Sequence, residues 1–199
     1  MIRTYSCAAL ALLTITAPAT AHATDVFVLG ELPVLRTPMA RYSDSNSKEN
    51  VPVPVTVGGR VSFTFEGKRK SNIFTGLTLR GGVTGTGDRL LQFRYDSGFR
   101  RMLQPRERTQ PFLELGFGFE AVQVRHHTDG LADMGAGPTL GVGWLVGDQR
   151  STVVGARITA AFMSGGYSYD SDDFENDTWY SVTYSPSNVT LAVTTGRVF

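Results

Sequence analysis

Apolar and polar residues alternate along most of this 199-residue chain. In residues 57–67, one face carries Val57, Val61, Phe63 and Phe65, and the other carries Gly58, Arg60, Ser62, Thr64 and Glu66. The same period of two recurs in residues 72–83, 89–101, 111–125, 131–146, 152–164 and 187–199. Because successive side chains of a strand point to opposite faces, each segment predicts a β-strand with one apolar and one polar face.

Two properties of these segments favour a membrane barrel over a soluble sheet. One face is almost purely apolar, whereas the other carries full charges. The segments run to roughly 11–15 residues, longer than the about 5–6 residues of a usual soluble strand and long enough to cross a bilayer at a tilt. The predicted fold class is therefore all-β, a single antiparallel up-and-down transmembrane β-barrel of about eight strands.

Outer-membrane barrels have short periplasmic turns and longer outer loops. The long connection at residues 165–178 is therefore expected outside, and alternation from it places residues 126–130 and 85–88 outside and residues 67–71, 104–110 and 147–150 on the periplasmic side. This arrangement gives seven strands from Val53 onward. An even strand number therefore requires one more strand earlier in the chain.

Residues 25–35 are the candidate for the eighth strand, and a long outer loop at residues 36–50 would follow it. The segment is a weak strand, because Pro33 lacks an N–H donor and Glu31 shares a face with apolar residues. We expect residues 179–199 to form one strand with a bulge or kink near Pro186. In the alternative, residues 24–50 form a periplasmic arm and the last segment splits at Pro186 into two strands.

The first residues have the features of a secretory signal peptide. Arg3 precedes an apolar stretch at residues 8–17, and Ala21-His22-Ala23 is an A-x-A cleavage site. We therefore expect a signal peptide at residues 1–23 and a barrel domain at residues 24–199. The single cysteine, Cys7, lies in the leader, so the mature chain would hold no disulfide and no cysteine metal site.

The net charge of +1, from 19 basic and 18 acidic residues, gives no electrostatic case for nucleic-acid binding. No cofactor and no metal ion is expected. His126 and His127, near Asp129 and Asp133, fit a solvated hairpin tip better than a zinc site, because adjacent strand residues point to opposite faces. The acidic stretch at residues 167–179 lacks the glycine and distal glutamate of a calcium loop and is expected to be a solvated outer loop.

The leader, the strands of period two and the terminal Phe199 together resemble the superfamily of small eight-stranded bacterial outer-membrane barrels. That superfamily includes the outer-membrane protein A, opacity protein and lipid A deacylase architectures. The resemblance implies a location in the outer membrane, with lipid and lipopolysaccharide around the wall. It also implies assembly by the barrel-assembly machinery through the C-terminal strand.

Charged residues gather on the face that would line the lumen. They are Arg60, Glu66, Arg80, Arg94, Asp96, Arg100, Glu114, Glu120 and Arg157. An eight-stranded barrel leaves an interior just wide enough for side chains, and buried charges must be paired. We therefore expect an ion-pair network that fills the lumen rather than an ion path or an acid–base site. Near the strand ends, an aromatic girdle at the membrane interfaces is expected from Trp144, Trp179, Tyr180, Tyr184 and Phe199.

These patterns favour a barrel with a structural or surface-interaction role, no open pore and no catalysis. One alternative is a lipid-modifying enzyme like the lipid A deacylases, whose pattern places a histidine two residues before a serine. Ser164 matches the serine, but Phe162 stands at the histidine position, so the serine lacks its base. The other alternative is a soluble periplasmic barrel or sandwich that binds an apolar ligand.

Overall fold

The computed structural model describes residues 23–37, 40–44, 48–50, 55–65, 71–83, 87–104, 108–126, 129–163, 167–173, 178–184 and 187–199. Within these ranges the chain forms twelve strands and no helix. They are β1 (Ala23–Arg36), β2 (Ala40–Asp44), β3 (Lys48–Asn50), β4 (Val55–Phe65), β5 (Ser71–Val83), β6 (Arg89–Met102), β7 (Thr109–His126), β8 (Asp129–Val146), β9 (Thr152–Met163), β10 (Tyr167–Asp173), β11 (Thr178–Tyr184) and β12 (Asn188–Val198).

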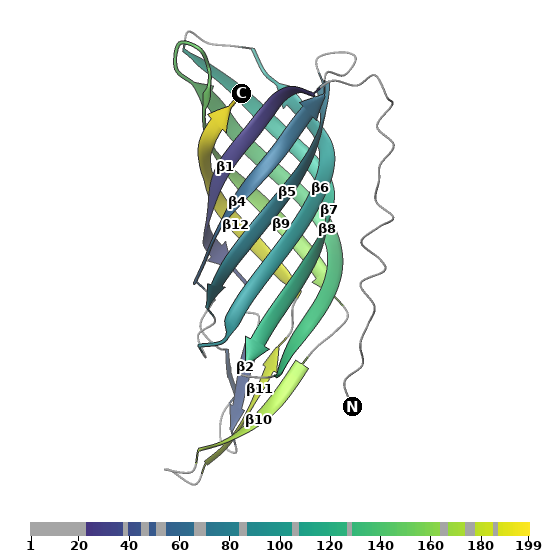
Figure 1. Cartoon of the computed structure of the whole chain (residues 1–199), viewed down its shortest axis with the longest axis vertical. Helices are drawn as coiled ribbons and strands as arrows, with labels where there is room; N and C mark the ends of the chain where they lie inside the picture. Colours follow the sequence, from purple (N-terminus) through teal and green to yellow (C-terminus); the bar gives the residue numbers. More distant parts are fainter. Residues whose placement is uncertain are drawn as a thin grey trace.

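Eight of these strands close into one barrel in the order β1-β12-β9-β8-β7-β6-β5-β4 (Figure 1). Each strand pairs with its neighbours in antiparallel fashion, and β1 closes the circle by pairing with both β12 and β4. Closure leaves none of these eight strands with a free edge, so the wall satisfies its own backbone hydrogen bonds. The predicted fold class and the eight-strand count are confirmed.

The first strand is confirmed, and the face that carries both apolar residues and Glu31 points into the lumen. Phe27, Leu29 and Glu31 are at most 5% exposed and line the lumen, so the wall's exterior carries the other face. The pairing with β12 shifts register between Pro33 and Leu35, where one extra residue forms a bulge. Pro33 cannot donate a ladder hydrogen bond, which explains why the irregularity lies beside it.

A second sheet corrects two expectations about the connections. Residues 36–50 and 165–178 were expected to be loops, yet β2, β3 and β10 lie within them. These strands join β11 in a four-stranded sheet of order β10-β11-β2-β3, which continues beyond one end of the barrel (Figure 1). Residues 179–199 are likewise two strands in two different sheets, so the prediction of one kinked strand was wrong. Alternation alone does not specify which strand is the partner.

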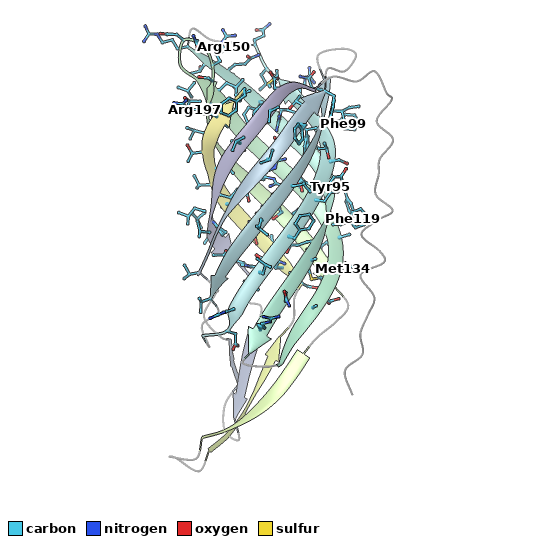
Figure 2. All side chains as sticks on the ribbon, in the orientation of Figure 1. Tyr95, Phe99, Phe119, Met134, Arg150 and Arg197 are labelled. Carbon is cyan, nitrogen blue, oxygen red and sulfur yellow. The ribbon has the colours of Figure 1, made fainter. Side chains whose placement is uncertain are left out.

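The exterior of the wall is apolar along its whole circumference. Phe99, Phe119 and Met134 project outward from β6, β7 and β8 (Figure 2) and are 61%, 52% and 62% exposed. Leu115 and Phe117 on β7 are exposed to a similar degree. The barrel is thus built inside out relative to a soluble protein, with its largest apolar side chains in contact with the surroundings.

One end of the barrel holds the C-terminus and the connections from β6 to β7 and from β8 to β9, and Phe199 exchanges two backbone hydrogen bonds with Val26 there, at 3.0 and 2.9 Å. The other end holds the two long connections that contain the second sheet, together with the short β5–β6 and β7–β8 connections. The β8–β9 turn is tight, with positive φ at Gly147 and Arg150 and a 3.0 Å hydrogen bond between them. We call the end that holds the C-terminus the short-turn end, and we call the end that continues into the second sheet the long-connection end.

Candidate functional site: the barrel lumen

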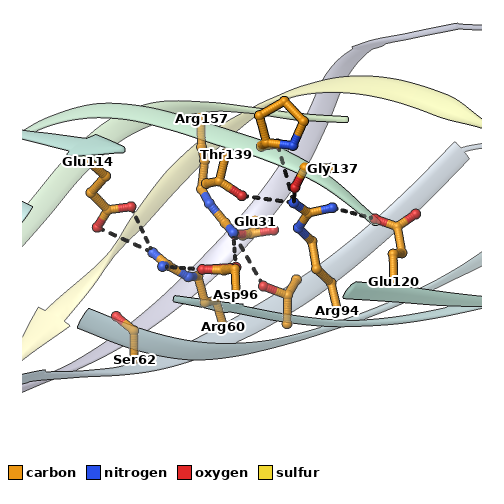
Figure 3. A network of polar contacts seen from close by, with 12 residues as sticks. Glu31, Arg60, Ser62, Arg94, Asp96, Glu114, Glu120, Gly137, Thr139 and Arg157 are labelled. Carbon is orange, nitrogen blue, oxygen red and sulfur yellow. Dashed lines mark hydrogen bonds and ion pairs between the residues drawn. The ribbon is translucent and has the colours of Figure 1, made fainter. Parts of the chain in front are cut away.

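A continuous chain of ion pairs crosses the inside of the barrel, and Figure 3 shows its central part from Glu31 to Glu114. Its members alternate in sign in the order Arg80, Glu31, Arg157, Asp96, Arg60, Glu114 and Arg100. They come from β5, β1, β9, β6, β4 and β7, with two of them on β6. Six of the eight wall strands are therefore tied to one another through side chains, in addition to their backbone ladders.

Each carboxylate in this chain lies between two guanidinium groups. Glu31 accepts from Arg80 at 2.8 Å and from Arg157 at 2.7 Å. Asp96 pairs with Arg157 and, at 3.0 Å, with Arg60. Because these side chains are at most 2% exposed, their charges have left water and each depends on its partners for compensation.

Glu114 completes the chain towards the short-turn end. It accepts from Arg60 at 3.2 Å and from Nε of Arg100 at 2.8 Å, and a second nitrogen of Arg100 also contacts it. Arg100 further donates to the hydroxyls of Thr64 and Ser62 on β4. All of these groups are buried, so Arg100 holds β4, β6 and β7 together at one level of the lumen.

A second polar cluster connects the remaining two wall strands. Glu120 on β7 pairs with Arg94 at 3.4 Å and accepts from Gln92 at 3.1 Å and from Asn188 on β12 at 2.9 Å. Arg94 also donates to Thr139 Oγ1 on β8 at 2.8 Å. With these contacts, every wall strand supplies at least one side chain to the polar interior.

Aromatic rings pack against the ion pairs on the side of the short-turn end. The Arg100 guanidinium lies 3.7 Å from the centroid of Phe27, and Phe74 and Phe112 lie farther away, at 5.5 and 5.4 Å. Phe27 and Phe112 meet edge to face with centroids 6.0 Å apart. A cation is attracted to an aromatic face, and the attraction is larger when both groups are desolvated, as they are here. The lumen therefore has an apolar layer between its charged layer and the short-turn end.

Glycines on the lumen face provide the room for these large side chains. A Cβ at Gly118 would lie 2.9 Å from Nη2 of Arg94 and 2.6 Å from a backbone oxygen. A Cβ at Gly143 would lie 2.5 Å from the ring of Phe112. Real Cβ atoms do not approach this closely, so the guanidinium and the ring occupy space that any other residue would fill.

Arg36 is a buried cation whose guanidinium has no hydrogen-bond acceptor among the described residues. The residue is 8% exposed, and the lack of an acceptor among those residues applies to all three guanidinium nitrogens. The bulge after Pro33 turns Arg36 inward, because the extra residue reverses the alternation of β1. Among the described residues, six buried arginines stand beside five buried carboxylates, which are Glu31, Asp88, Asp96, Glu114 and Glu120.

The structure buries eight of the nine residues that the sequence placed in the lumen, and Glu66 lies outside the described residues. Sequence reasoning missed Glu31, Arg36, Gln92 and Asn188, and it missed the apolar layer around Phe27. Gln92 lies two residues before Arg94 and therefore on the same strand face, so alternation was the one signal that placed it in the lumen. Glu31 shares a face with Phe27 and Leu29, and alternation alone does not show whether such a mixed face lines the lumen or meets lipid.

The predicted aromatic girdle divides between two parts of the molecule. Trp144, 47% exposed on β8, and Phe199, 71% exposed, lie at the short-turn end of the wall. Trp179, Tyr180 and Tyr184 lie on β11, which belongs to the second sheet and not to the wall. The girdle role of all five stays a prediction.

The remaining candidates lie largely outside the described residues. Ser164 and His127 are outside them, and only the backbone of His126 is described. The predicted leader is also outside them, apart from Ala23, where β1 begins. In the part of the chain that is described, no group of three or more His, Cys, Asp or Glu side chains is placed to hold a metal ion. No helix in that part is long and apolar enough to span a membrane.

A closed barrel with apolar side chains outside and paired charges inside is a transmembrane β-barrel. Such a wall is stable where its exterior contacts hydrocarbon, since a closed barrel leaves no backbone group unsatisfied in lipid. The protein is a small eight-stranded barrel of this class. The alternative of a soluble barrel with an apolar ligand cavity does not fit, because the apolar faces point outward.

No protein-family model matches the sequence, and no curated protein matches it. Among solved structures, Neisserial surface protein A is similar with a TM-score of 0.48 at 10% identity, over 86% of this chain and 96% of that chain. OprG from Pseudomonas aeruginosa has a TM-score of 0.47 at 9% identity, over 89% and 96%. Ail of Yersinia pestis has a TM-score of 0.41 at 10% identity, over 89% and 100%. At these scores the likenesses bear on neither function nor ligand, and the fold rests on the chain's own strand pairing.

Proposed function

We propose that this protein is a structural or surface-interacting outer-membrane barrel whose lumen is closed to solutes by its charge network. The observation that carries the proposal is the unbroken chain of ion pairs from Arg80 to Arg100. It crosses the interior between six wall strands, and its side chains are at most 3% exposed. A water-filled channel would leave such groups hydrated and accessible.

Opening this lumen would require several buried ion pairs to separate at once. Breaking a buried pair by removing one partner costs about 3–5 kcal/mol. The carboxylates of Glu31, Asp96 and Glu114 each bridge two arginines, so displacing one carboxylate uncovers two cations. The network therefore favours one closed arrangement over partly open ones.

The proposed surface role belongs to the second sheet. It continues from the end of the barrel opposite to the C-terminus and the short turns (Figure 1). In outer-membrane barrels the short turns are periplasmic and the longer connections are outside. In this orientation the strands β2, β3, β10 and β11 extend from the cell surface, among lipopolysaccharide, where they would meet surface partners.

The C-terminal strand is proposed to be what the barrel-assembly machinery recognises. β12 pairs with β1 to close the barrel, and its pairing extends to Phe199. Before closure, the edge of β12 is unpaired and ends on an aromatic residue. An exposed strand edge readily pairs with another chain, which suits it to transient recognition during insertion.

Conductance across a planar lipid bilayer tests the closed lumen. The purified wild-type barrel is expected to insert without producing stepwise ion currents. An Asp96→Ala, Arg157→Ala double variant, which removes the centre of the ion-pair chain, is expected to conduct. Asp148→Asn is the matched control, since Asp148 belongs to an exposed ion pair at the short-turn end. Stepwise currents from the wild-type protein would overturn the proposal.

The proposed role is not enzymatic. Glu31, Asp96, Glu114 and Glu120 are each paired with an arginine, so none of these four carboxyl groups is placed as a proton donor or acceptor for a substrate. Incubation with purified lipid A, followed by mass spectrometry of the lipid, is expected to show no loss of acyl chains. Acyl-chain release that disappears in Ser164→Ala would establish the deacylase alternative instead.

A further inference from the structure

Two arginines face each other across neighbouring strands on the outside of the barrel wall. Arg89 on β6 and Arg125 on β7 are direct register partners at the long-connection end. Both are exposed, and both share the outward face with Leu91 and Gln123, which form the next outward pair. Like charges directly opposite each other on antiparallel strands destabilise the pair, so this arrangement needs compensation.

The compensation does not come from the described part of the chain. Neither guanidinium makes an ion pair or a hydrogen bond with a described residue. On the other side of Arg89, the register partner on β5 is Val83, and Gln123 is paired with Ala132 on β8. No described carboxylate shares this outward patch.

The two arginines border a hollow in the outer surface of the wall. Its volume is about 350 Å³, and it is lined by Gly82, Arg89, Leu90, Leu91, Gln123 and Arg125. Arg89, Arg125 and Gln123 give it two cations and an amide, while Leu91, 46% exposed, gives it an apolar part. A ligand that fits this hollow has an anionic head and an apolar body.

We propose that Arg89 and Arg125 together bind the phosphate group of a phosphorylated glycolipid in the outer leaflet. The oxygens of one phosphate group can accept hydrogen bonds from both guanidinium groups at once, and the negative charge of the phosphate offsets the repulsion between the two arginines. The acyl chains of the same lipid lie against Leu91 and the apolar wall below it. The inference rests on the proposed orientation, in which the long-connection end lies at the cell surface, and it is independent of whether the lumen is closed.

The opposite end of the barrel provides an internal comparison. Arg101 on β6 is also exposed and also faces outward, but its register partners are Ser71 on β5 and Leu113 on β7. It therefore has no second arginine across from it. Arg101 is a control on the same strand, because it is an exposed, outward arginine at the other end of the wall with no second arginine opposite it.

Lipid binding to the folded barrel in detergent micelles tests the proposal. Native mass spectrometry would count adducts with bisphosphorylated lipid A, with the dephosphorylated lipid and with inorganic phosphate. The variants are Arg89→Gln, Arg125→Gln and their combination, with Arg101→Gln as control. We expect the double variant to lose affinity for the phosphorylated lipid about tenfold or more, equivalent to one strong charge-assisted contact. We expect Arg101→Gln to bind like the wild type.

The lipid controls separate the possible sources of phosphate. Wild-type binding of the dephosphorylated lipid should fall to the level of the double variant, and inorganic phosphate at equal concentration should form no adduct. If inorganic phosphate binds as tightly as the lipid, the site takes a free anion and the lipid assignment fails. Equal losses in the double variant and in Arg101→Gln would show general surface charge and would overturn the site. Since conductance is measured separately, this result is distinguishable from failure of the closed lumen.

Discussion

Glu31 and Arg157 are 126 positions apart in the chain, yet Arg157 Nη1 donates to Glu31 Oε1 at 2.7 Å in the middle of the barrel. The pair joins β1 to β9, which do not neighbour each other in the wall because β12 lies between them. The contact therefore spans the lumen instead of following the backbone ladder. It adds a tertiary constraint that fixes how the strands lie across the interior.

Replacing Glu31 by leucine is expected to lower the free energy of unfolding by about 3–5 kcal/mol, because the change uncovers two buried arginines. Urea titration of the barrel in lipid vesicles measures it. Arg80 has Glu31 as its ion-pair partner, so adding Arg80→Met to Glu31→Leu should recover part of the loss. A double variant no more stable than Glu31→Leu would contradict this account. Asp148→Asn, which removes an exposed ion pair, should leave stability unchanged.

Arg36→Met is expected to raise the free energy of unfolding by about 1 kcal/mol or more, because it removes a buried guanidinium that has no hydrogen-bond acceptor among the described residues. The same substitution at Arg94 should lower stability by about 3 kcal/mol, since it removes the ion-pair partner of the buried Glu120 carboxylate. The two variants differ in sign although both delete a buried lumen arginine. A loss of stability in Arg36→Met as large as that in Arg94→Met would show that Arg36 is compensated.

Gly118→Ala is expected to destabilise the barrel by about 1–3 kcal/mol through overpacking. The added methyl group would meet the Tyr95 carbonyl oxygen at 2.6 Å and Nη2 of Arg94 at 2.9 Å. Gly30→Ala is the matched control, because its methyl group would meet only the Thr195 carbonyl oxygen, at an ordinary 3.7 Å. Unfolding curves for the two variants should separate clearly, and equal midpoints would show that the lumen has spare room.

Phe199→Ala is expected to reduce recovery of the protein in the outer membrane of cells severalfold, while the purified variant refolds in vesicles with little change in stability. The side chain is 71% exposed, and the bonds between Phe199 and Val26 come from the backbone, so the folded wall loses little. Val193→Ala removes a lipid-facing side chain from the same strand and serves as control. Equal recovery of both variants would argue against recognition of the terminal residue during assembly.

Parity along each strand predicted the lumen residues on β4, β5, β6, β7 and β9 because it is a local property. Once Phe93 is known to face outward, Arg94 must face inward. The same logic does not assign the faces of β1, where Phe27 and Leu29 lie inside with Glu31. In a narrow barrel the apolar face is not always the lipid face, because part of the lumen near the short-turn end is itself apolar.

The sequence by itself determined that this chain forms antiparallel strands with one charged and one apolar face, closed into a barrel that places the apolar face in lipid. Strand alternation carries that information residue by residue. Only the tertiary structure decided which charges meet, that β11 leaves the wall to join β2 and β10, and that a bulge after Pro33 turns Arg36 inward. These features depend on strand register and stagger around a closed wall, and register is set by contacts between residues far apart in the chain.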